Sequence, residues 1–99
     1  MRRYGGRVQL RFDWDPNKAE SNWRKHGVTF QEARTAFADF GSGTVSDPLR
    51  SEVEDRAVTM GRSEADRVLV VVHTDDGDTI RIISARPATK RERHDYAEL

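Results

Sequence analysis

The segment Val68–Val72, which reads VLVVV, constrains the fold of this chain more than any other stretch of the sequence. An unbroken run of apolar residues, four of them β-branched valines, predicts a strand that is buried on both of its faces. The stretches Arg56–Arg62 (RAVTMGR) and Asp78–Pro87 (DTIRIISARP) also read as strands, and Asp76-Gly77 is a turn dipeptide before the last of them. The C-terminal half is therefore predicted to be an antiparallel β meander.

The N-terminal half predicts a strand followed by helices. Apolar residues at positions 8, 10, 12 and 14 alternate with polar ones, which is the period of a half-buried strand. Asp15-Pro16 then predicts the start of a helix, because aspartate caps exposed amides and proline is tolerated in the first turn. This helix is expected to run to about Lys25, with Ala19 and Trp23 on its inner face.

Two further helices are predicted from capping boxes, in which a threonine and a glutamate each satisfy the backbone amide of the other. Thr29 and Glu32 begin the first, and Thr89 and Glu92 begin the second, which is expected to end near Ala97. Apolar side chains at helical spacing after Thr29 are expected in the core: Phe30, Ala33, Phe37 and Phe40. With a short strand at 44–46, the predicted order is β-α-α-β-β-β-β-α, an α+β fold with helices packed on an antiparallel sheet.

The composition bounds the class of protein. A chain of 99 residues builds one domain, which is expected to span residues 1–99. Residues 1–7 could be disordered. The sequence has no cysteine, which excludes disulfides and thiolate–metal sites and suits a reducing cytoplasm. No apolar run is long enough for a bilayer span, so we expect a soluble cytoplasmic protein. The formal net charge of 0 argues against a general nucleic-acid coat, which needs a basic excess.

Charge is nevertheless segregated along the chain. The segment 51–55 (SEVED) is acidic, whereas the last strand and helix are basic. Arg62 and Arg86 lie at the ends of predicted strands, and Arg81 lies within one. A guanidinium matches a phosphate with two parallel hydrogen bonds, so these arginines are candidates for holding RNA or stabilising charge on a phosphate under attack.

The alternation of side chains along a strand is a geometrical objection to this interpretation. Arg81 and Arg86 are separated by an odd number of residues, so they point to opposite faces unless a bulge intervenes or the strand has already ended. The structural alternative for Arg81 is an ion pair with Glu54 or Asp55. The last helix adds Lys90, Arg91 and Arg93 to this positive group. The structural alternative for Lys90, Arg91 and Glu92 is exposed helix charge, with Glu92 used in capping.

The remaining candidates are Lys25, His26 and Tyr96. Cations at the end of a helix are stabilised by its dipole, and His26 could equally serve as an acid or base near neutral pH. Tyr96 could pack on the sheet or stack on a base. The three histidines lie far apart in the sequence, and neither a phosphate-binding glycine loop nor a metal-binding motif is present, so no cofactor and no metal are expected.

The blocks FDWDPNKAESNWRKHGVTFQEARTAF, EDRAVTMGRS, RVLVVVHT and IRIISARPATKRERHDY resemble, in this order, the BrnT family of toxins from bacterial type II toxin–antitoxin systems. The resemblance covers about residues 12–96. It implies a RelE-like ribonuclease fold, RNA cleavage and growth arrest. It also implies a BrnA-like antitoxin with a ribbon-helix-helix DNA-binding part, which forms a complex with two copies of each protein and represses the operon; DNA is then contacted only through the antitoxin.

The resemblance carries over to particular positions. It implies Arg62, Arg81 and Arg86 as site residues, with Lys25 and His26 as additions, and Tyr96 corresponds to a tyrosine on the last helix of RelE-like enzymes. It suggests metal-independent cleavage, in which the 2′-hydroxyl attacks the adjacent phosphate. A non-catalytic module that binds RNA or protein through the same basic surface remains an alternative, as does a degenerate toxin kept as a repressor subunit.

Overall fold

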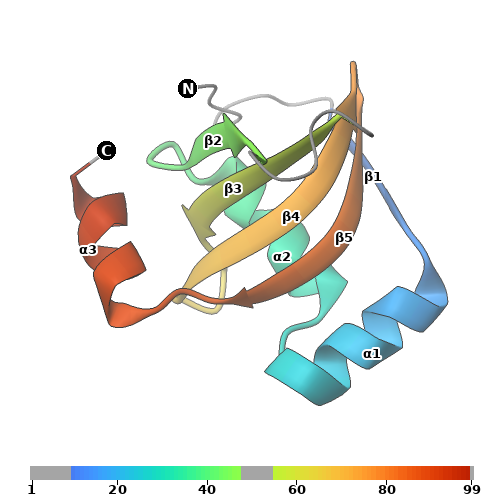
Figure 1. Cartoon of the computed structure of the whole chain (residues 1–99), viewed down its shortest axis with the longest axis horizontal. Coiled ribbons are helices and arrows are strands. Elements are labelled where there is room, and N and C mark those ends of the chain that lie inside the picture. Colours follow the sequence, from blue (N-terminus) through green and yellow to red (C-terminus); the bar gives the residue numbers. More distant parts are fainter. Residues whose placement is uncertain (1–9, 48–54, 99) are drawn as a thin grey trace.

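The computed structural model describes residues 10–47 and 55–98 and contains one five-stranded sheet in the order β1-β5-β4-β3-β2 (Figure 1). The strands are β1 (Arg11–Trp14), β2 (Gly43–Ser46), β3 (Arg56–Arg62), β4 (Val68–Asp76) and β5 (Thr79–Pro87). The helices are α1 (Pro16–His26), α2 (Phe30–Thr35), the 3₁₀ helix η1 (Ala36–Ala38) and α3 (Lys90–Ala97). The predicted order is confirmed, and strands β2 to β5 form the predicted meander. The sheet is not wholly antiparallel, however, because β1 pairs with β5 in parallel.

The core explains why the valine run is apolar throughout. Helix α2 lies across one face of the sheet (Figure 1), where Phe30 and Phe37 pack on Leu69 and Val71 of β4. Val68 and Val70 point to the other face, where a second, smaller cluster includes Tyr96 of α3. Residues 68–71 are all buried, which confirms burial of β4 on both faces.

A β-bulge in β5 reverses the alternation of its side chains. Val72 of β4 pairs with Ser84, but the next residue, His73, pairs with Ile82, so Ile83 is an extra residue in β5. Ile82 and Ala85 therefore both face the core although an odd number separates them. The same bulge determines where the arginines of β5 point.

Helix α1 lies against the edge of β5 beyond the point where β1 ends. Asn22 is buried there, and its side-chain amide accepts from the Ala85 amide at 2.9 Å and donates to the Ala85 carbonyl at 2.8 Å. Its amide nitrogen also donates to the Val28 carbonyl at 2.9 Å. Asn22 thus replaces a neighbouring strand at this edge, and it satisfies backbone groups that burial would otherwise leave unpaired.

Two predicted core residues are wrong. Trp23 is 56% exposed, because α1 rests on the sheet edge through Asn22 and Ala19 rather than through the face that carries the tryptophan. Phe40 is 78% exposed, because the helix tightens to 3₁₀ geometry at Ala36 and ends at Ala38, which breaks the helical phase before Phe40.

The helix ends agree with the predicted caps except at Glu32. The Asp15 side chain accepts from the Asn17 amide at 2.8 Å, and α1 ends at Gly27 in the left-handed conformation at φ 66°. The box formed by Thr89 and Glu92 is complete. The box predicted for Thr29 and Glu32 is only half formed: Thr29 caps the Glu32 amide, but the Glu32 carboxylate is turned to Arg67 and Ser63.

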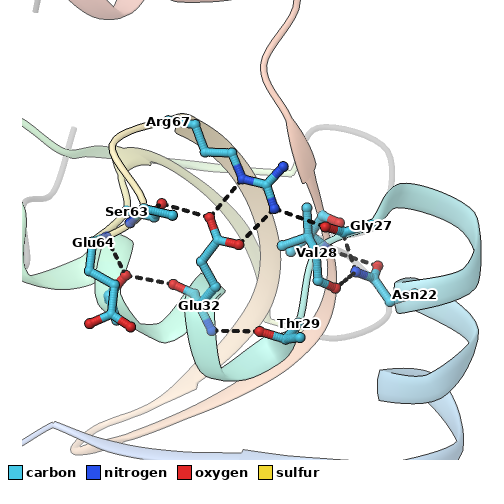
Figure 2. A network of polar contacts seen from close by, with 11 residues as sticks. Asn22, Gly27, Val28, Thr29, Glu32, Ser63, Glu64 and Arg67 are labelled. Carbon is cyan, nitrogen blue, oxygen red and sulfur yellow. Dashed lines mark hydrogen bonds and ion pairs between the residues drawn. The ribbon is translucent and has the colours of Figure 1, made fainter.

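Figure 2 shows what the Glu32 carboxylate does instead. Arg67 donates to both of its oxygens, at 2.8 and 2.7 Å, and also to the Gly27 carbonyl at 2.8 Å. Ser63 donates to it at 2.7 Å. This network ties the junction of α1 and α2 to the turn between β3 and β4, so it is a structural feature of the fold.

Some of the expectations fall on residues outside the described ranges. These are the start of the first strand at Val8, the order of residues 1–7, and the acidic stretch 51–54 with the predicted partner Glu54. Among the described residues, no helix is both long and apolar enough to cross a membrane.

Candidate functional site

The bulge places Arg62, Arg81 and Arg86 on the same face of the sheet, which removes the objection from strict alternation. Directly paired residues of neighbouring strands share a face. Arg62 pairs with Val68, Arg86 with Val70 and Arg81 with Thr74, so all three partners lie on β4 at alternating positions. This is the face opposite to α2, and we call it the open face.

Distance divides the three arginines. Arg62 and Arg86 flank β4 two residues apart, and their Cα atoms are therefore separated by about 12 Å, within the combined reach of two long side chains. Arg81 lies six residues along β4 from the partner of Arg62, which is about 20 Å along the strand. The open face thus brings Arg62 near Arg86 and leaves Arg81 at its far end.

Arg62 of β3 belongs to a cluster with Tyr96 of α3 and with Asp39, which follows η1. The Tyr96 hydroxyl of α3 donates to the Asp39 carboxylate at 2.5 Å, and the Arg62 amide donates to it at 2.8 Å. The Arg62 guanidinium lies over the Tyr96 ring, 5.8 Å from its centroid. The Arg62 guanidinium forms an ion pair with Asp66 at 3.3 Å. The Asp66 side chain is 88% exposed, so this pair is weak and another anion can replace Asp66.

The cluster fixes the protonation of its members. Burial raises the pKa of Asp39, but hydrogen bonds from Tyr96 and from the amides of Arg62 and Gly41 outweigh burial and hold the pKa below its ordinary value. Burial, and then the hydrogen bond to the Asp39 carboxylate, raise the pKa of Tyr96 above 10.0. At neutral pH the cluster therefore holds a carboxylate, a neutral phenol and a guanidinium.

Arg86 is held by the helix that follows it. It donates to both oxygens of Glu92, at 2.7 and 2.8 Å, and Glu92 also accepts from the Thr89 amide at 2.9 Å. The hydrogen bonds from Arg86 lower the pKa of Glu92 to about 2. Arg86 thus fixes the start of α3, the helix that carries Tyr96, and any anion that binds Arg86 competes with Glu92.

Arg81 forms an ion pair with Asp13 of β1, its direct neighbour across the parallel pairing. The alternative of an ion pair for Arg81 is therefore confirmed, with Asp13 as its partner. Of the two example acids, Glu54 lies outside the described residues.

Lys25 and His26 lie in a separate depression. It has a volume of about 360 Å³ and is formed between α1 and the bulge of β5, with Lys18, Ser21 and Ser84 also in its lining. Among the residues that the structure describes, neither Lys18 nor Lys25 makes an ion pair. The structure therefore brings Tyr96 to Arg62 but does not bring Lys25 and His26 to that cluster.

Asp39 is the member of the cluster that the sequence does not predict. It follows the 3₁₀ helix, and its contact with Arg62 spans 23 residues of sequence. No spacing or motif around Asp39 indicates such a contact. Within residues 10–47 and 55–98, no group of three His, Cys, Asp or Glu side chains is placed to hold a metal ion.

Comparisons with known proteins agree with the resemblance. The family model described as "Ribonuclease toxin, BrnT, of type II toxin-antitoxin system" matches residues 14–92. A crystal structure of the Brucella abortus ribonuclease toxin, BrnT, matches with a TM-score of 0.64 and 20% sequence identity, covering 82% of this chain and 99% of that one. At this identity the structural match shows a shared fold. No curated protein sequence matches the chain. Since the family model covers most of its length, the chain belongs to the BrnT family of type II toxin–antitoxin toxins.

Proposed function

We propose that this toxin is an endoribonuclease that cleaves RNA without a metal ion and thereby arrests growth. The observation that carries the proposal is the contact of Arg62, Tyr96 and Asp39 at the edge of the open face, with Arg86 on the same face. Membership of a family described as ribonuclease toxins supports the activity in general.

The reaction that suits these groups is attack by the 2′-hydroxyl of the RNA on the adjacent phosphorus. A bond forms between the 2′ oxygen and phosphorus, and the bond from phosphorus to the 5′ oxygen breaks. The products are a 2′,3′-cyclic phosphate and a free 5′-hydroxyl. The reaction needs a group to accept the 2′ proton, a group to protonate the leaving oxygen, and positive charge around the phosphate.

Each member of the cluster has a role in this scheme. Arg62, whose exposed partner Asp66 competes weakly, stabilises the charge that grows on the phosphate. Tyr96 protonates the leaving oxygen, because its raised pKa keeps the hydroxyl protonated at neutral pH. Asp39 stays ionised and orients the tyrosine through their hydrogen bond. In this scheme Asp39 also takes the 2′ proton.

The other predicted residues act outside this cluster. Arg86 adds positive charge on the same face and holds α3 through Glu92. Arg81 contacts the RNA backbone at the far end of the open face, and Lys25 and His26 contact it in the depression beside α1.

We also propose how the toxin is controlled. A type II toxin has a protein antitoxin, and the resemblance suggests a BrnA-like ribbon-helix-helix protein that joins it in a 2:2 complex and represses the operon. On this proposal the free toxin meets its RNA in the cytoplasm and contacts DNA only through its partner.

The test is cleavage of single-stranded RNA by the purified chain in excess EDTA. We expect fragments that end in 2′,3′-cyclic phosphate, and a fall in kcat of about 100-fold for Arg62→Ala, since one group that stabilises transition-state charge is lost. Arg24→Ala is the matched control, because Arg24 is an arginine of α1 paired with Glu20. Loss of cleavage in EDTA would refute the metal-free scheme, and RNA binding without turnover would favour the non-catalytic module.

A further inference from the structure

A groove of about 560 Å³ lies beside the Arg62 cluster, and residues of α2 and η1 contribute to its lining. One wall is Leu10 and Phe12 at the β1 edge of the sheet, and the other is formed where β3 ends. The groove has an apolar surface and a charged margin. Its apolar lining is Leu10, Phe12, Phe37 and Ala38, and its charged lining is Arg34, Asp39, Arg62 and Glu64.

Arg34 is a cation of this groove whose guanidinium is held by an aromatic ring. Its guanidinium carbon lies 5.6 Å from the centroid of the Phe12 ring, so the aromatic face holds the plane of the guanidinium in place. No ion pair of Arg34 exists among the described residues, in contrast to Arg62, Arg67 and Arg86. Guanidinium planes held in this way stack on unpaired nucleobases.

The polar groups of the groove favour a base over a backbone phosphate. The hydroxyl of Ser63 is already used in the network of Figure 2, where it donates to Glu32, and Thr35 donates to the Glu32 carbonyl. The Glu64 carboxylate makes no ion pair among the residues that the structure describes. This Glu64 carboxylate repels phosphate but can accept hydrogen bonds from the N–H groups of a base.

We propose that this groove binds a nucleotide of single-stranded RNA next to the scissile phosphate, with its base stacked on Arg34. The groove shares Arg62 and Asp39 with the cluster, so a base in it would place the neighbouring phosphate beside Arg62. This inference rests on the proposed ribonuclease function and adds to it a subsite that selects the cleavage position. Arg34 is a binding residue of this subsite and takes no part in proton transfer.

The experiment measures both cleavage and binding of a short single-stranded RNA for the wild type, Arg34→Ala, Arg34→Lys and the control Arg24→Ala. For Arg34→Ala we expect KM and the dissociation constant to rise about 10-fold or more, because a stacked base is lost, while kcat changes less than 3-fold. Arg34→Lys should recover only part of the affinity, since it keeps the charge but not the plane. The distribution of cleavage positions should also change in Arg34→Ala, because the subsite selects them.

Each outcome separates this inference from the proposed function. If the wild type cleaves RNA and Arg34→Ala behaves like Arg24→Ala in KM, affinity and cleavage positions, the subsite is wrong and the ribonuclease proposal stands. If the wild type neither cleaves nor binds RNA, both are wrong. If Arg34→Ala binds RNA normally but loses affinity for the co-purified antitoxin, the groove belongs to the protein partner and the subsite is again wrong.

Discussion

At the scale of single residues, the carboxylate of Asp39 joins Arg62 of β3 to Tyr96 of α3. Asp39 accepts from two backbone amides and a phenol at once, which keeps it ionised although burial opposes its charge. The guanidinium of Arg62 in turn lies over the ring of this phenol. The direction of each pKa shift therefore follows from the position of its neighbours.

Tyr96→Phe tests the role of the hydroxyl alone. The ring would still pack on the open face and under Arg62, so only the hydrogen bond to Asp39 is lost. If Tyr96 is the proton donor, we expect kcat to fall about 100-fold with KM nearly unchanged. Because the pKa of Tyr96 is raised above that of an ordinary tyrosine, the wild-type rate should decline only in strongly alkaline solution, where the phenol ionises, and the variant should lack that decline.

The control for this substitution is His94→Ala on the same helix, because the His94 side chain is exposed and lies 3.9 Å from the carboxylate of Glu98. It should leave kcat unchanged. A Tyr96→Phe enzyme that keeps full kcat across the pH range would remove the tyrosine from the mechanism.

At the scale of elements, local sequence signals predict the ends of helices well but not where the helices rest. Asp15 and Thr89 cap their helices as expected, because capping depends on neighbours within four residues. The position of α1 depends instead on Asn22, whose partner Ala85 is 63 residues away. The hydrophobic periodicity of α1 predicted Trp23 on the inner face, because this method considers only apolar residues. It cannot identify Asn22, a polar residue that is buried because it bonds to the edge of a strand.

Asn22→Ala is expected to destabilise the fold through α1. It would leave the amide and carbonyl of Ala85 and the carbonyl of Val28 without their partner in a buried setting, which costs about 2–3 kcal/mol in the free energy of unfolding. Urea denaturation measures this cost. Asn17→Ala is the matched control on the exposed side of α1 and should change the free energy by less than about 0.5 kcal/mol. Equal effects of the two substitutions would contradict the role given to Asn22.

At the scale of the whole molecule, the fold could be predicted because each strand has a recognisable pattern of apolar residues. The arrangement of the charged residues could not be predicted in this way. The meander follows from VLVVV and the strands beside it. A single extra residue, Ile83, then decides that Arg81 and Arg86 share a face, and β1 supplies Asp13 as the partner of Arg81 from 68 residues away. The sequence pattern of a β-bulge or of a parallel edge strand is weak. The positions of these arginines therefore could not be predicted from the sequence.

The carboxylates that hold distant elements together also make the whole molecule sensitive to acid. Hydrogen bonds from Arg67 lower the pKa of Glu32 although burial opposes them, and those from Arg86 lower the pKa of Glu92 to about 2. A carboxylate whose pKa is lower in the folded state than in the unfolded state stabilises the fold above its unfolded value, here 4.5. That stabilisation is lost as the pH falls from about 5 towards 2.

We therefore expect the free energy of unfolding to fall by about 1–2 kcal/mol between pH 6 and pH 3, after allowing for the solvent that screens both pairs. In Glu32→Gln/Glu92→Gln the stability at pH 7 should already be lower by a similar amount and should vary less with pH, because neither glutamine can be protonated in this range. Urea denaturation at a series of pH values measures both slopes, with Glu20→Gln, from the exposed pair with Arg24, as the control. Parallel curves for the wild type and the double variant would show that the acid sensitivity arises from other groups, whereas a flattened curve would show that these two arginine–glutamate pairs hold the β3–β4 turn and α3 to the rest of the fold.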